Sequence, residues 1–122
     1  MARRWIAAAL DASTWTPAAK FPGDQSAIAG GPAGVFLLAK PKSGYGAYSV
    51  ARLDPTATGY TLGAARVISK DSGNVLGRIF EDPSGRLYAA WQQGGAGMLL
   101  RTTETKAGAQ PTFGKSRTIN TG

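Results

Sequence analysis

The stretch Glu81-Asp82-Pro83-Ser84-Gly85-Arg86-Leu87-Tyr88-Ala89-Ala90-Trp91 decides the fold class of this 122-residue chain. It places a turn rich in Asp, Pro, Ser and Gly directly before a short strand-forming segment, a pattern typical of a β-hairpin. Two more strand-like segments follow it, at Met98–Thr103 and Thr112–Ile119. One turn and three strands in this order make up a unit, and an earlier part of the chain repeats the order.

Helical periodicity is weak along most of the chain, and turn residues separate short apolar segments throughout. Arg3–Ala12 is the one helix candidate, because it is rich in alanine and has an apolar stripe at helical spacing. The predicted strands are Ser26–Gly30, Gly34–Lys40, Ala47–Leu53, Thr61–Ser69, Val75–Phe80, Arg86–Gln92, Met98–Thr103 and Phe113–Asn120. Strands at this spacing predict an antiparallel all-β fold.

The repeat comprises two full units, at residues 26–70 and 74–120, after a half unit at residues 3–22. Trp15, Tyr60 and Phe113 take matching positions about 45 to 53 residues apart. Propeller blades of four strands repeat at roughly 40–50 residues. We therefore expect one domain over residues 1–122, a partial β-propeller of four-stranded antiparallel blades with two blades plus an outer half blade.

Three segments carry a family resemblance. They are Leu10-Asp11-Ala12-Ser13-Thr14-Trp15-Thr16, Leu53-Asp54-Pro55-Thr56-Ala57-Thr58-Gly59-Tyr60, and the expanded Thr103–Phe113. Each resembles the Asp-box, or bacterial neuraminidase, repeat of sialidase-like propellers. The resemblance implies a structural motif, in which Asp accepts backbone N–H groups across a turn, Gly supplies a positive φ, and an aromatic ring packs between sheets. The positions with this expected role are Asp11, Trp15, Asp54, Tyr60, Gly85 and Phe113.

Sialidases hold the substrate carboxylate with three arginines, the first of them usually in an Arg-Ile-Pro motif. Gly77-Arg78-Ile79-Phe80 resembles that motif in part, with Phe80 in place of proline. The alternative is an Arg78 that lines a central channel and pairs with Glu81 or Asp82. The chain has no His and no Cys, and most carboxylates stand in turn sequences. We therefore expect no complete catalytic set, no metal site and no cofactor.

Trp91, Gln92 and Gln93 form a second candidate ligand site, because an aromatic ring beside amides suits a sugar. The alternative for Trp91 is packing between blades.

The formal charge is +7, but the basic residues are scattered, so a solvated surface is favoured over a nucleic-acid footprint. No apolar run is long enough to span a membrane, and the chain is expected to be soluble. The apolar segment after Arg4 ends after six residues, short of a secretory signal, although the family is often secreted.

These observations predict a non-catalytic, propeller-type binding or scaffold module, directed to glycans. Two blades and an outer half blade do not close a ring, so we expect completion by self-association into a homo-oligomer or by the remainder of a larger propeller. The alternative is a fragment of a sialidase-like glycoside hydrolase with most catalytic residues outside this chain. A basic polyanion binder is a third hypothesis.

Overall fold

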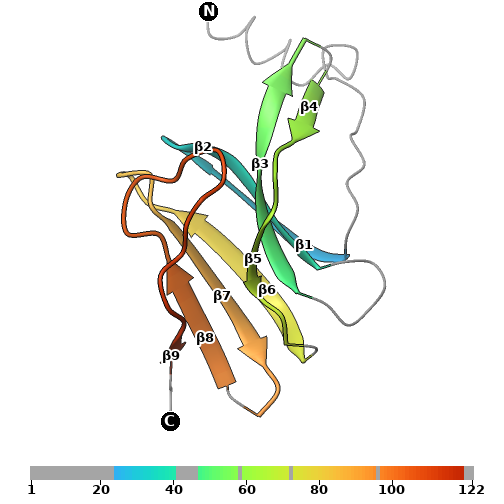
Figure 1. Ribbon diagram of the computed structural model, residues 1–122, viewed down its shortest axis with the longest axis vertical. Coiled ribbons are helices and arrows are strands. Elements are labelled where there is room, and N and C mark those ends of the chain that lie inside the picture. The colour runs from blue at the N-terminus through green and yellow to red at the C-terminus, as the bar shows by residue number, and fades with distance from the viewer. Residues whose placement is uncertain (1–23, 41–46, 58, 72, 96, 120–122) are drawn as a thin grey trace, which may run out of the picture.

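The computed structural model describes residues 24–40, 47–57, 59–71, 73–95 and 97–119. The predicted half unit at residues 3–22 lies outside these ranges, as do the helix candidate Arg3–Ala12 and the motif residues Asp11 and Trp15. The described chain is all-β and forms two antiparallel sheets (Figure 1). None of its elements is a helix long and apolar enough to cross a membrane.

The first sheet begins with three antiparallel strands in chain order, β1 (Asp24–Gly31), β2 (Gly34–Lys40) and β3 (Tyr48–Thr56). Two short strands, β4 (Gly59–Leu62) and β5 (Arg66–Ser69), then pair with different parts of β3. The single predicted strand Thr61–Ser69 is therefore wrong: residues 63–65 interrupt it. Gly63 donates its N–H to the carbonyl of Arg52 at 2.8 Å as the chain passes from β4 to β5.

The second sheet has four strands in chain order, β6 (Asn74–Glu81), β7 (Leu87–Gln93), β8 (Gly97–Thr102) and β9 (Arg117–Ile119). The last strand is shorter than the predicted Phe113–Asn120. Phe113 forms only an isolated bridge with Thr103, and Gly114 donates its N–H to the Thr102 carbonyl at 2.8 Å. The ladder resumes at Arg117, which pairs with Leu100.

The two sheets contact each other mainly along their first strands, β1 and β6, which lie next to each other (Figure 1). Alternate side chains of β2, β3, β7 and β8 point into the space between the sheets and form one core. Its main members are Phe36, Leu38, Tyr48, Val50, Leu87, Ala89, Trp91 and Leu99. Each large apolar side chain in this core stabilises the fold by about 1.5–3 kcal/mol.

A β-bulge in β6 lets the sheets come this close. The pairing of β6 with β7 shifts register between Val75 and Arg78, and Leu76 within the bulge has a φ of 55°. A left-handed φ is costly for a leucine, so the surrounding structure must hold it in place. The bulge brings the backbone of Gly77 against the Tyr48 ring of the first sheet.

Candidate functional site

The turn between β6 and β7 is built around Asp82. One of its oxygens, Oδ1, accepts hydrogen bonds from the Ser84 hydroxyl at 2.6 Å, the Ser84 N–H at 2.9 Å and the Arg86 N–H at 3.1 Å. The other, Oδ2, accepts the Tyr88 hydroxyl at 3.0 Å. The bond from the Ser84 side chain is the largest of the effects that lower the pKa of Asp82 to about 2. This carboxylate is therefore ionised, and both of its oxygens already accept hydrogen bonds.

Gly85 completes that turn. Its φ is +87°, a conformation that favours glycine, and its N–H bonds to the Asp82 carbonyl at 2.9 Å. Gly85 lies in the structural position that the sequence assigned to it, a tight turn. A side chain there would also meet Lys106, whose Cγ would lie 2.7 Å from the added Cβ.

Glu81, next in the chain to Asp82, serves a different turn. Its side chain is buried against the first sheet, where Oε1 accepts the N–H of Ala33 in the β1–β2 turn. Oε2 has no hydrogen-bond partner among the described residues. Gly31 makes room for this carboxylate, since a Cβ on Gly31 would lie 2.8 Å from Glu81 Cδ. The two neighbouring carboxylates therefore do not face a common site.

Arg78 lies exposed on β6, and its Nη1 donates to the Gly77 carbonyl at 2.9 Å. The alternative pairing of Arg78 with Glu81 or Asp82 is wrong, because Glu81 turns toward Ala33 and Asp82 is bonded within its own turn. Within the described ranges, the ion pair is Arg52–Asp54 at 2.6 Å. Arg78 instead presents its guanidinium from the side of β6 that faces away from the first sheet.

Trp91 lies in the core, with an exposed fraction of 1%, and its ring centroid is 6.5 Å from that of Tyr48. It presents no ring face to a sugar, and the alternative role of packing between the sheets describes its position. Gln92 is exposed and Gln93 half-buried at the far end of β7. The structure therefore separates Trp91 from the polar residues with which the sequence grouped it.

The remaining motif positions are Phe113, Tyr60 and Asp54. Phe113 is buried in the core, as expected for an aromatic residue that packs between sheets. Tyr60 does not pack between sheets in this way, because 49% of its surface is exposed. Asp54 is held by the Nε of Arg52 rather than by backbone N–H groups of a turn. The Asp-box likeness of residues 53–60 therefore does not extend to the packing of its aromatic residue.

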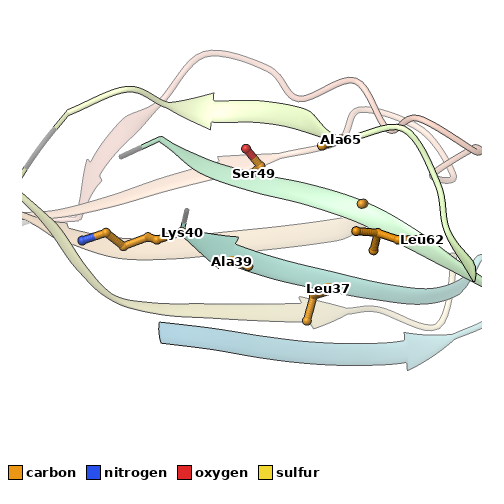
Figure 2. A pocket seen from close by; sticks show the side chains of 7 residues that line it. Leu37, Ala39, Lys40, Ser49, Leu62 and Ala65 are labelled. Atoms are coloured by element: carbon orange, nitrogen blue, oxygen red, sulfur yellow. The ribbon is translucent and has the colours of Figure 1, made fainter. Parts of the chain in front are cut away.

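A hollow of about 220 Å³ lies on the outer face of the first sheet, the side turned away from the second sheet. Figure 2 shows side chains from β2, β3 and β4 around it. The lining is mostly small or apolar, with Leu37, Ala39, Ser49, Ala51, Leu62 and Ala65, and it also includes Lys40. The corresponding outer face of the second sheet carries Phe80, 60% exposed, with its ring centroid 6.1 Å from that of Tyr88.

A second hollow, of about 320 Å³, adjoins the β1–β2 turn and has a different chemistry. Its lining includes Arg52, Asp54, Pro55 and Tyr60. Because Tyr60 pairs with Pro55 and Thr61 pairs with Asp54, the Tyr60 ring and the Arg52–Asp54 ion pair lie on opposite faces of the first sheet. The Arg52–Asp54 pair was not singled out from the sequence. The available signal was the i, i+2 spacing of Arg52 and Asp54, which places both side chains on one face of a strand.

No three His, Cys, Asp or Glu residues gather closely enough to hold a metal ion within the described ranges. No family model, curated protein or solved structure matches this chain.

Proposed function

We propose that this chain is a non-catalytic, propeller-type scaffold and binding module whose two sheets are successive blades. The observation that carries the proposal is the pairing of two antiparallel meanders, joined directly in sequence, that meet along their first strands β1 and β6. In a propeller, four-stranded sheets repeat around a central channel, and their first strands converge on it. The strands β4 and β5 together take the fourth position of the first blade.

The outer faces of both sheets support the need for a covering partner. Phe80 and Ile28 are 60% and 62% exposed, and Ile119 is 39% exposed. Terminal repeats of a solenoid or propeller array normally carry polar outer faces or are capped. Exposed apolar faces, such as those that carry Phe80 and Ile28, mark interaction surfaces. The module is completed by further sheets, from a second copy of this chain or from a larger parent chain.

The carboxylates support a non-catalytic role. Glycoside hydrolysis needs two carboxyl groups facing one site about 5–9 Å apart. Asp82 and Asp71 accept hydrogen bonds from their own turns, Glu81 accepts the Ala33 N–H and Asp54 pairs with Arg52. Each of these groups holds the backbone or a cation in place.

The test is the oligomeric state, measured by size-exclusion chromatography with light scattering over a range of protein concentrations. We expect the wild-type chain to self-associate and the Phe80→Lys variant to do so more weakly. Thr105→Lys is the matched control, because it adds the same charge at an exposed position outside the outer faces. A wild-type chain that remains a well-folded monomer at low micromolar concentration would contradict self-association.

A second candidate is a fragment of a sialidase-like hydrolase, and the exposure of Arg78 on β6 favours it. Its test is hydrolysis of a fluorogenic sialoside by the wild-type chain and by Arg78→Ala. Activity that disappears in Arg78→Ala would support the hydrolase and overturn the non-catalytic module.

A further inference from the structure

The outer face of the first sheet is apolar across its width. Phe36 and Leu38 point toward the second sheet, so the residues that alternate with them on β2 point away from it. Strand pairing then fixes the rest of this face, because directly opposite partners lie on the same side of a sheet. Two uncharged rows of partners cross it, Ile28–Leu37–Ala51 and Val35–Leu53–Leu62.

The edges of this face are open to solvent. Ile28 on β1 is 62% exposed, and Val67 on β5, which pairs with Ser49, is 43% exposed. The hollow of about 220 Å³ shown in Figure 2 lies over β2 and β3, the two strands between them. A continuous apolar face of this kind is typical of a contact surface.

Residues 1–23 join the sheet beside this hollow. β1 begins at Asp24, which pairs with Lys40 at the end of β2. Lys40 and its neighbour Ala39 both line the hollow. The opposite face of β1 is already covered, because β1 packs against β6 of the second sheet. The apolar surface next to this point of attachment is therefore the outer face.

The segment of residues 3–22 suits the outer face in length and in composition. Twenty residues span about 30 Å even as a helix, whereas four neighbouring strand positions span only about 14 Å. Asp11 is the single acidic residue of the segment, and its basic residues stand near its two ends. Its large apolar side chains are Trp5, Ile6, Leu10, Trp15 and Phe21.

The second sheet of another copy suits the outer face less well. The outer face of that sheet carries Arg78 and Arg117, in one row with Ala90 and Leu100. Contact between the two outer faces would bury both guanidinium groups against the uncharged rows of the first sheet. A buried charge without a partner is costly. The charges therefore favour the chain's own segment as the occupant.

We propose that residues 3–22 dock on the outer face of the first sheet of the same molecule and fill its hollow with a large apolar side chain. This inference deepens the proposed function, and it rests on the premise that the outer faces are contact surfaces. It assigns the covering of the first sheet to the chain itself. The outer face of the second sheet, which carries Phe80, is then the one left for a partner.

The test is paramagnetic broadening of amide signals in the ¹⁵N-labelled full chain. The chain has no cysteine, so Ser13→Cys gives a single site for a nitroxide label. We expect strong broadening at Ala39, Ala51 and Leu62 and little at Leu100 of the second sheet. Ser116→Cys is the matched control at an exposed position, and its label should broaden signals of β8 and β9 instead.

A mixture of two samples separates docking within one molecule from docking between molecules. Nitroxide-labelled Ser13→Cys chain without ¹⁵N is mixed with ¹⁵N-labelled wild-type chain. The signals of Ala39, Ala51 and Leu62 should stay sharp in this mixture. Broadening as strong as that within the labelled chain would place the segment on a neighbouring copy and overturn the proposal.

Substitutions at two neighbouring alanines test the surface itself. Ala64 and Ala65 are both exposed, and of the two Ala65 lines the hollow. Ala65→Lys should shift the docking equilibrium about tenfold toward the undocked form, because docking would bury an unpaired charge. The broadening from the Ser13 position should fall accordingly, whereas Ala64→Lys should leave it unchanged. Unchanged signals of the second sheet show that both variants are folded.

Three further results would overturn the proposal. They are broadening spread evenly over both sheets, broadening centred on the second sheet, and equal broadening in the Ala65→Lys and Ala64→Lys variants. Each can occur whether or not light scattering detects self-association. The failure of this docking is therefore distinguishable from the failure of the proposed function.

Discussion

The phenolic oxygen of Tyr48 accepts a hydrogen bond from the backbone N–H of Gly77 at 2.8 Å, and this bond joins the two sheets at the bulge in β6. Tyr48 comes from β3 of the first sheet and is fully buried. The ring edge lies so close to Gly77 that the backbone, not a side chain, forms the contact. One aromatic residue thus fills the core and satisfies a bulge N–H that the β6–β7 ladder leaves out.

Gly77→Ala should destabilise the fold by about 1–3 kcal/mol, because the added Cβ would overpack the core. It would lie 2.7 Å from Tyr48 Cζ and 2.9 Å from Leu38 Cδ2. Urea denaturation gives the free energy of unfolding. Gly108→Ala is the control, since nothing lies within 4 Å of its added Cβ. Equal midpoints for the two variants would contradict this close packing.

Tyr48→Phe should cost about 1–3 kcal/mol of stability, because it leaves the buried Gly77 N–H without its acceptor. Thermal and urea unfolding measure the loss. The same substitution at the half-exposed Tyr60 removes a hydroxyl from the surface and should change stability little. The prediction fails when the two variants are equally stable.

Asp82 should make stability depend on pH in the acid range. Its folded pKa is about 2, below the ordinary value of 3.8, chiefly because the Ser84 hydroxyl bonds to the charged form. A depressed pKa adds stability that is present above the unfolded value and is lost as pH falls from about 4 toward 2. Over this range the wild type should lose stability relative to Asp82→Asn, measured by urea unfolding at each pH.

Carbon-13 detection of the carboxyl groups gives an independent measurement of the same effect. The Asp82 signal should titrate near pH 2, and Ser84→Ala should raise its midpoint, because the largest favourable bond is removed. A midpoint close to 3.8 in the wild type would show that the turn bonds do not form in solution.

Arg101→Lys should loosen the segment that leads into β9. The guanidinium donates to three carbonyls, those of Gly114 at 2.6 Å, Ile68 at 2.8 Å and Phe113 at 3.1 Å. Burial lowers the pKa of Arg101, yet the group stays charged. Lysine keeps the charge but lacks the planar fork, so we expect a loss of about 1–3 kcal/mol.

Hydrogen exchange of residues 113–117 is the local readout for Arg101→Lys, and faster exchange there is expected. Arg86→Lys, at an exposed position in the β6–β7 turn, is the matched control and should leave exchange unchanged. Equal exchange in both variants would mean that the three carbonyl bonds do not hold this segment.

Local patterns predicted much of the fold. The bounds of β2, Gly34–Lys40, agree with the prediction, and β6, β7 and β8 differ from it by one residue at each end. The break between β4 and β5 was missed, because Gly63 stands in a segment that otherwise favours a strand. The candidate sites were less predictable, since Trp91 and Tyr60 are both aromatic residues near strand ends and only one of them is covered.

The sequence by itself determined most of the strands and the Asp82–Gly85 turn, because side-chain alternation and turn conformation act over a few residues. The tertiary structure decided which faces are buried. Trp91 is hidden because the first sheet covers β7, and Glu81 bonds to Ala33 across 48 positions of chain. It also decided that Tyr60 pairs with Pro55 and Thr61 with Asp54, so the Tyr60 ring and the Arg52–Asp54 pair lie on opposite faces of the first sheet; this register depends on how β3 and β4 pair and not on either strand alone.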